Sequence, residues 1–103
     1  MNVITEYASG VAVPFAMGFD LTDATRVEFG LKRADGTTVL RDLQAADWNT
    51  ITTGQTLNVS LLDGEITRWG YYVAQLHVTK ANLKLPSDKV LISVKKRVAV
   101  FGA

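Results

Sequence analysis

The chain has 103 residues, and its 11 basic and 10 acidic residues give a formal charge of +1. This length suits one domain, so we expect a single domain over residues 1–103. The balanced charge argues against nucleic acid as a partner, because proteins that bind nucleic acids usually carry a basic excess. The chain has no cysteine, which excludes disulfides and thiolate metal sites.

The N-terminal segment lacks the basic region of a signal peptide and carries Glu6 instead. We therefore expect no secretion through a signal peptide, and a location in the cytoplasm. No apolar run approaches the roughly 20 residues that a membrane helix needs. The apolar stretch 11–19 is short and is interrupted by Pro14 and Gly18, so we expect no membrane contact.

Alternation of apolar and polar residues dominates the pattern along the chain. Val27, Phe29 and Leu31, for example, alternate with charged residues and a glycine. A period of two is typical of strands that place one face on a core and the other toward water or a partner. On this basis we predict strands at 2–7, 11–16, 25–33, 37–43, 49–52, 56–62, 71–80 and 89–101.

Turn residues separate these segments. Asp35-Gly36 supplies the positive φ values of a tight hairpin turn, and Asp63-Gly64 ends another strand in a similar way. Residues 82–88, which include a proline, are predicted as a longer loop, and 43–48 could form one helical turn. Short strands at this spacing predict an all-β domain of about seven or eight antiparallel strands, and we favour a two-sheet sandwich over a small barrel.

Motifs of catalysis are missing from the sequence. It contains no Gly-rich phosphate loop, no GxSxG and no HExxH. His77 is the one histidine, and it shares the outward phase of its strand with Gln75 and Thr79. A surface or interface role for His77 is favoured over a catalytic role, because no serine lies in a recognisable nucleophile turn. We therefore expect neither an enzyme nor a cofactor.

Paired carboxylates and one basic cluster are the remaining charged features. Asp20 with Asp23, and Asp63 with Glu65, lie at strand ends, where such residues usually form turns by bonding nearby backbone. A calcium site is the less favoured reading, because neither segment has the alternating ligands of a calcium loop. The run 95–97, Lys-Lys-Arg, is interpreted as an exposed strand edge rather than a phosphate contact, since no aromatic residues are interleaved with it.

Aromatic residues cluster at the start of the strand predicted over 71–80. Tyr72 lies in the inward phase and is expected in the core, whereas Tyr71 lies in the outward phase beside Val73. A strand that is apolar on both faces suggests that its second face is covered by another element or another subunit. Trp69 lies at the rim of this outward face.

Several segments together resemble the N-terminal immunoglobulin-like domain of phage baseplate upper proteins. They are Phe19-Asp20-Leu21-Thr22, Val27-Glu28-Phe29-Gly30-Leu31-Lys32, Asp35-Gly36-Thr37 and the Gly70-Tyr71-Tyr72 that opens a later strand. The resemblance covers about residues 15–80. It implies an immunoglobulin-like, Greek-key β-sandwich and a structural protein of a phage or prophage, from the tail or baseplate, a connector or the head. Its location would then be the virion, or the cytoplasm of the producing bacterium.

Two functions remain open from the sequence. The first is an assembly module that contacts other virion proteins and its own copies, with Trp69, Tyr71, Val73, Gln75 and His77 on one surface and Val98, Val100 and Phe101 in a tail that could add a strand to a neighbour. The second is a carbohydrate-binding module that stacks glycan rings on Trp48, Trp69 or Tyr71.

Overall fold

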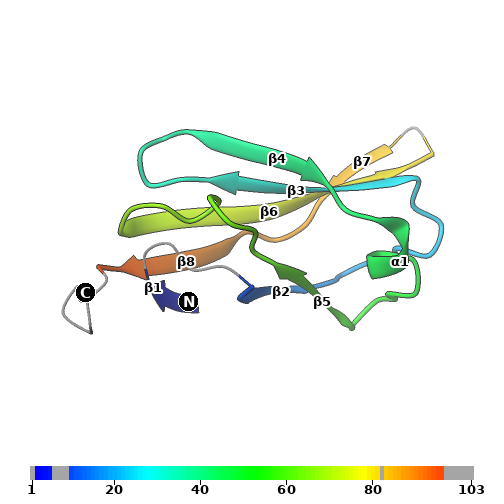
Figure 1. Ribbon diagram of the computed structural model, residues 1–103. Coiled ribbons are helices and arrows are strands. Elements are labelled where there is room, and N and C mark those ends of the chain that lie inside the picture. The colour runs from blue at the N-terminus through cyan, green and yellow to red at the C-terminus, as the bar shows by residue number, and fades with distance from the viewer. Residues whose placement is uncertain (1, 6–9, 82, 97–103) are drawn as a thin grey trace.

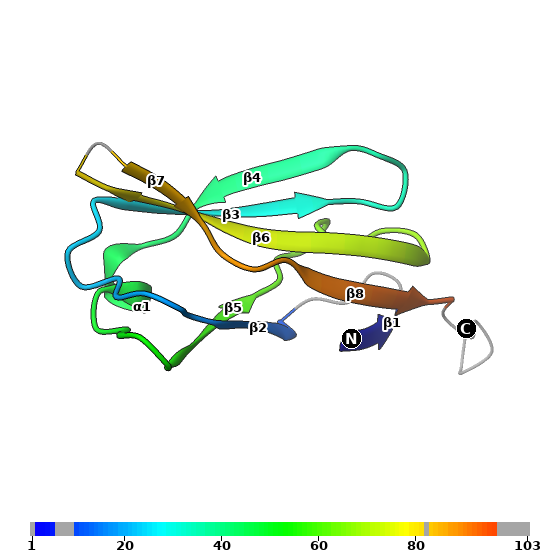
Figure 2. The ribbon, with the colours of Figure 1, turned by 180° about the vertical axis from the view of Figure 1, so that it is seen from behind.

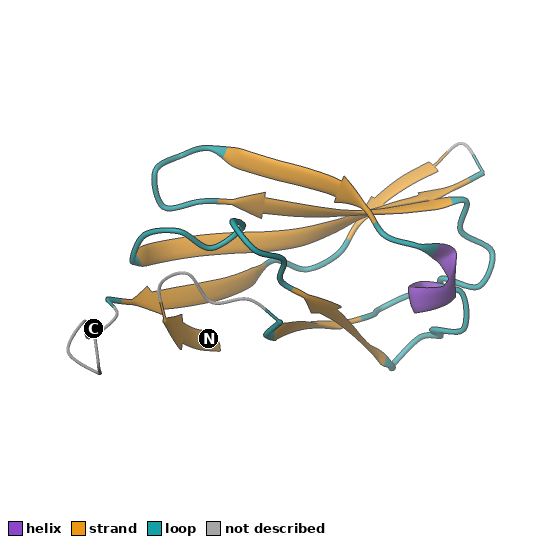
Figure 3. Cartoon of the chain, viewed as in Figure 1, coloured by secondary structure: helices purple, strands orange, loops and turns teal. Residues whose placement is uncertain are grey.

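The computed structural model describes residues 2–5, 10–81 and 83–96, and within them the chain forms strands and one short helix (Figure 1). In chain order the elements are β1 (Asn2–Thr5), β2 (Ala12–Ala16), β3 (Arg26–Lys32), β4 (Thr38–Asp42), α1 (Ala45–Trp48), β5 (Thr56–Ser60), β6 (Gly70–Lys80), β7 (Leu83–Pro86) and β8 (Val90–Lys95). Figure 3 shows how strands and loops account for nearly all of the described chain. The prediction of an all-β chain is therefore confirmed.

The larger sheet is built around β6, the longest strand. Its order is β1-β8-β6-β3-β4, and β7 also pairs with β6. β6 bonds β3 along one edge, and β8 and β7 along successive parts of the other edge. Because β6 has a neighbouring strand on each side, its side chains point alternately into the core and toward the outer face of the sheet.

The smaller sheet consists of β2 and β5, which pair antiparallel, with Val13 opposite Val59 and Phe15 opposite Leu57. It lies as a second layer against one face of the larger sheet, as the two views related by a half-turn show (Figures 1 and 2). The predicted two-sheet arrangement is therefore observed. The apolar side chains of each strand are buried between the two layers, and this burial stabilises such a domain.

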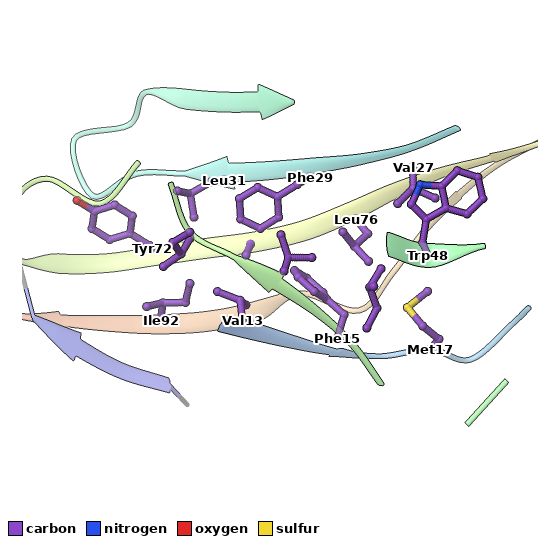
Figure 4. Packing of buried hydrophobic residues seen from close by; sticks show 14 of the residues in the cluster. Val13, Phe15, Met17, Val27, Phe29, Leu31, Trp48, Tyr72, Leu76 and Ile92 are labelled. Carbon is purple, nitrogen blue, oxygen red and sulfur yellow. The ribbon is translucent and has the colours of Figure 1, made fainter. Parts of the chain in front are cut away.

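The core lies between the two sheets. Val27, Phe29 and Leu31 of β3 are fully buried, as the alternation predicts. The rings of Phe29 and Phe15 meet edge to face, with 6.1 Å between their centroids, and so join the two layers. Figure 4 shows the buried side chains that fill the interior from one end to the other; those labelled are Val13, Phe15, Met17, Val27, Phe29, Leu31, Trp48, Tyr72, Leu76 and Ile92.

The pairing of β1 corrects the expectation of a wholly antiparallel domain. β1 runs parallel to β8, with Val3 opposite Ser93 and Ile4 opposite Val94. Chain order gives no sign of this, since the two strands come from opposite ends of the sequence. The parallel contact completes one rim of the larger sheet and places the first strand beside the last.

The strand predicted over 49–52 is wrong. Residues 49–52 form a turn instead, in which the N–H of Ile51 donates to the carbonyl of Trp48 at 3.0 Å. The helical turn predicted within 43–48 is confirmed as α1, whose last residue, Trp48, is buried and donates from its indole Nε1 to the carbonyl of Leu43 at 3.3 Å. Ile51 then bonds Leu21, whose N–H donates to the Ile51 carbonyl at 2.9 Å, outside either sheet. Because these backbone groups bond the preceding helical turn and Leu21 instead of a neighbouring strand, the segment does not become a strand.

The loop predicted over 82–88 is also wrong in part, because it contains β7. Pro86, which cannot donate a backbone hydrogen bond, is tolerated as the last residue of this strand. Directly after it, the N–H of Ser87 donates to the carbonyl of Leu76, while Ser87 Oγ accepts from the N–H of Leu76, both at 2.9 Å. Ser87 therefore replaces a missing strand contact, and β8 resumes pairing with β6.

The last predicted strand, 89–101, is described in the structure only as far as residue 96. β8 is Val90–Lys95, and Val98, Val100 and Phe101 lie outside the described residues. Lys95 and Lys96 are exposed at the end of β8. The interpretation of this run as a strand edge is wrong for Lys95, because β8 lies between β1 and β6 and Lys95 is paired with Thr5 of β1.

The hairpin between β3 and β4 has one positive φ angle, at Gly36 (+90°), rather than positive values at both Asp35 and Gly36. Asp35 instead accepts from the N–H and hydroxyl of Thr37 at 2.9 and 2.6 Å, which lowers its pKa from the usual 3.8. We expect Gly36→Ala to lower the free energy of unfolding by about 1 kcal/mol, because a side chain disfavours this backbone conformation. Chemical denaturation measures the change.

Gly18→Ala is the matched control for this glycine. Gly18 has no positive φ angle, and a Cβ there would meet nothing within 4 Å. The same added methyl group should therefore leave stability unchanged or slightly raise it, since alanine restricts the unfolded chain. Equal losses at the two positions would contradict the role assigned to Gly36.

Candidate functional site

The outer face of β6 carries the residues singled out in the sequence. Tyr71 is 70% exposed, His77 is exposed, and Val73 and Gln75 are half-buried. Tyr72 lies in the opposite phase and is buried. Along β6, successive side chains therefore alternate between the surface and the core.

Neighbouring strands extend this surface with apolar residues. Tyr71 of β6 lies opposite Ser93 of β8, which lies opposite Val3 of β1; one step along, Val73 lies opposite Leu91. Val3 is 61% exposed and Leu91 49%. We call the set Val3, Tyr71, Val73 and Leu91 the outer apolar patch.

Val3 and Leu91 were missed as site residues. Leu91 alternates outward along its strand, so the signal was present in the sequence. Val3 reaches the patch through the parallel pairing of β1 with β8, and no local pattern indicates which strands become neighbours.

Trp69 lies at the end of the patch, just before β6, and is 60% exposed. A shallow groove of about 410 Å³ runs from Trp69 and Tyr71 past Ser93 to Lys95 and Lys96. The groove therefore has aromatic walls on one side and cationic side chains on the other. Its position makes Trp69 the rim residue of the patch, as the sequence placed it.

Gln75 and His77 are held in place by local contacts. The amide Nε2 of Gln75 donates to the carbonyl of Ser87 at 2.7 Å, so Gln75 supports the junction between β7 and β8. The His77 ring lies over Gly30, where an added Cβ would come within 3.1 Å of its Nε2. Within this face, His77 lies opposite Glu28, at the polar end of the sheet.

That polar end carries exposed ion pairs. Arg26 contacts Asp42 through two nitrogens, at 2.6 and 3.2 Å, and also approaches Glu28 at 3.4 Å. The Arg26 guanidinium lowers the pKa of Asp42 below its usual 3.8. The outer face thus has an apolar half over β1, β8 and the start of β6. The half over β3 and β4 carries these ion pairs together with the exposed Leu40.

Asp20 and Asp23 hold loops in place, and their partners are distant in sequence rather than nearby. Asp20 Oδ1 accepts from the N–H of Thr53 at 2.7 Å and from its hydroxyl at 3.0 Å, and these bonds lower the pKa of Asp20. Asp23 pairs with Lys80 at 2.9 Å, which lowers the pKa of Asp23. In the described part of the chain no group of three or more potential metal ligands gathers at one place.

Glu65 lies in a turn and bonds nearby backbone, as the sequence suggests, but its side chain is also buried. It is 5% exposed, and its carboxylate binds Arg41 at 2.8 and 3.2 Å and accepts from the N–H of Leu62 at 2.7 Å. Arg41 also donates to the carbonyl of Ser60 at 2.6 Å, and its guanidinium lies 4.9 Å from the centroid of the Phe29 ring. This buried pair joins β4 to the turn that follows β5.

Trp48 cannot serve as the exposed stacking platform that the carbohydrate hypothesis allows, because it is 5% exposed and packs in the core (Figure 4). Trp69 and Tyr71 keep that possibility open. Among the described residues no helix has the length and apolar character needed to cross a membrane.

Comparisons of the chain with protein-family models, with curated proteins and with solved structures found no match.

Proposed function

We propose that this chain is an immunoglobulin-like, Greek-key sandwich that serves as an assembly and interaction module of a phage or prophage virion. Two features support the fold proposal. The sheet order β1-β8-β6-β3-β4 opposite β2-β5 suits such a sandwich, and residues 15–80 resemble the baseplate domain. The resemblance is also what points to a tail, baseplate, connector or head component.

The outer apolar patch is the observation that carries the proposal. It lies on a sheet, where its members are fixed by strand pairing, and it faces away from the core. Contiguous exposed apolar surface on a sheet face is typical of protein interfaces. Tyrosine and tryptophan are common at the centres of such interfaces, because they bury much area at low cost in side-chain entropy.

The mechanism is burial of this patch against neighbouring virion proteins, including other copies of the chain. Covering a large apolar side chain contributes about 1.5–3 kcal/mol relative to leaving it exposed. Part of this gain is offset by the loss of translational freedom on association. In a symmetric ring the same contact would be repeated at every interface, so the stabilisation would add up without any other kind of contact.

Light scattering after size exclusion, over a wide concentration range, tests the proposal. We expect the wild-type protein to gain mass with concentration, and Tyr71→Ser/Leu91→Ser to have a lower mass at the same concentration, since the variant loses the two largest members of the patch. The matched control is Leu62→Ser, which changes a residue that is 52% exposed outside the patch. A mass in the patch variant equal to that of the wild type would contradict the proposed interface.

A carbohydrate-binding module is the second candidate, and one feature favours it. Trp69 lines a hollow of about 300 Å³ together with Asp35 and Arg68, whose polar groups could bind sugar hydroxyls. Because Trp48 is buried, fluorescence quenching on addition of oligosaccharides would report on Trp69. Saturable quenching together with a strictly monomeric mass would favour this function over assembly.

A further inference from the structure

β4 forms a free rim of the larger sheet. It pairs with β3 alone among the described strands, and it lies along the upper border of the molecule in both Figure 1 and Figure 2. Its central residue, Leu40, is 56% exposed. A strand in this position presents unpaired backbone groups to any strand that approaches it.

The hydrogen bonds to β3 show which groups are unpaired. Arg33 donates to the carbonyl of Thr37 at 2.8 Å, and Leu43 donates to the carbonyl of Val27 at 2.9 Å. In an antiparallel pair the direction of these groups alternates. The N–H and C=O groups of Thr38, Leu40 and Asp42 therefore point away from β3.

The two strands of the smaller sheet carry features that hinder pairing at their edges. In β2, Pro14 lies between the residues that bond β5, so its nitrogen faces outward and cannot donate. In β5, the carbonyl of Ser60 is taken by Arg41 at 2.6 Å. β4 carries neither proline nor lysine, the residues that commonly prevent edge-to-edge pairing.

We propose that β4 pairs with the β4 of a second copy of this chain, antiparallel about a twofold axis at Leu40. In this register Leu40 lies opposite Leu40 of the second copy, and Thr38 lies opposite Asp42. All the outward backbone groups of β4 then find a partner. The two larger sheets become one continuous sheet across the axis.

The charges on the outer face suit this register. Lys32 lies beside Thr38, and Glu28 lies beside Asp42. The pairing therefore places the two carboxylates and one guanidinium of the Arg26 cluster of one copy next to Lys32 of the other, on both sides of the axis. Sliding the strands by two residues in one direction would oppose Arg41 with Arg41, and in the other direction would leave Asp42 beyond the end of the second strand. The sequence of β4 thus fits a copy of itself in one register.

The contact is expected to be weak. An edge-to-edge pairing buries less than the roughly 1,200 Å² of total surface that stable complexes cover. Main-chain hydrogen bonds and the central leucine pair contribute most of its stability. Pairing through β4 is independent of the proposed function, because the outer apolar patch lies toward the opposite rim of the sheet.

Placing a charged residue at position 40 tests whether Leu40 lies opposite Leu40 of the second copy. Leu40→Lys and Leu40→Glu each place like charges opposite one another, so each variant alone should dimerise at least roughly tenfold more weakly than wild type. An equimolar mixture of the two should regain the dimer, because lysine then faces glutamate. Sedimentation equilibrium, repeated in the Tyr71→Ser/Leu91→Ser background, measures the masses without the patch contact.

Leu83→Lys is the matched control, since Leu83 is 64% exposed on β7 and should not affect dimerisation. Thermal unfolding verifies that each variant is folded. Three outcomes would overturn the proposal: a strict monomer in both backgrounds at the highest soluble concentration, a dimer that Leu40→Lys leaves intact, or a mixture that does not regain the dimer. The patch contact is tested by comparing the mass of the wild type with that of Tyr71→Ser/Leu91→Ser. The β4 contact is tested by the change at Leu40 within each of these two proteins, so the failure of one contact can be told from the failure of the other.

Discussion

Phe29→Ala is expected to lower the free energy of unfolding by about 4 kcal/mol, the largest effect of any change considered. Phe29 is fully buried, its ring meets Phe15 across the two sheets, and its face supports the Arg41 guanidinium. Alanine removes all three contacts and leaves a cavity between the layers. For a domain of this size, Tm should fall by about 20 °C, which calorimetry measures.

Phe19→Ala provides the comparison for this core change. Phe19 is half-buried at the edge of the core, where the Lys80 ammonium lies 5.8 Å from its ring centroid. The same atoms are removed, but water can fill the space, so the loss should be well below that at Phe29. A loss at Phe19 as large as that at Phe29 would show that the contact between the layers is not the centre of the core.

Glu65→Ala is expected to cost about 3 kcal/mol, because it leaves Arg41 partly buried without its carboxylate and removes the acceptor of the Leu62 N–H. Glu65→Gln, which keeps an acceptor but loses the charge, should give an intermediate loss. Urea denaturation at neutral pH measures both.

Asp42→Ala is the control for burial. Asp42 forms a two-nitrogen contact with Arg26 much like that of Glu65 with Arg41, but the two side chains of the Arg26 pair are 56% and 60% exposed. Water solvates the separated charges there, so the loss should be small and should shrink further at high salt. Similar losses for Asp42→Ala and Glu65→Ala would contradict the argument that burial sets the value of the Arg41 pair.

Local alternation allowed the core and the outer face to be predicted. Phe29 in the core, Tyr72 beneath β6, and Tyr71 and Val73 on its outer side all follow from a period of two. This works because successive side chains of any strand point to opposite faces, whatever strand lies beside it. The turn at Gly36 follows similarly from a property of the residue itself.

Features that depend on which strands become neighbours were decided by the tertiary structure. The parallel pairing of β1 with β8 brings Val3 to the outer apolar patch. The approach of β4 to the turn after β5 makes the turn residue Glu65 a buried partner of Arg41. The segment 49–52 forms a turn and not the predicted strand, because Ile51 bonds Trp48 and Leu21 and has no neighbouring strand to pair with. These contacts join residues far apart in the chain, and a period-two pattern carries no information about the identity of the neighbouring strand.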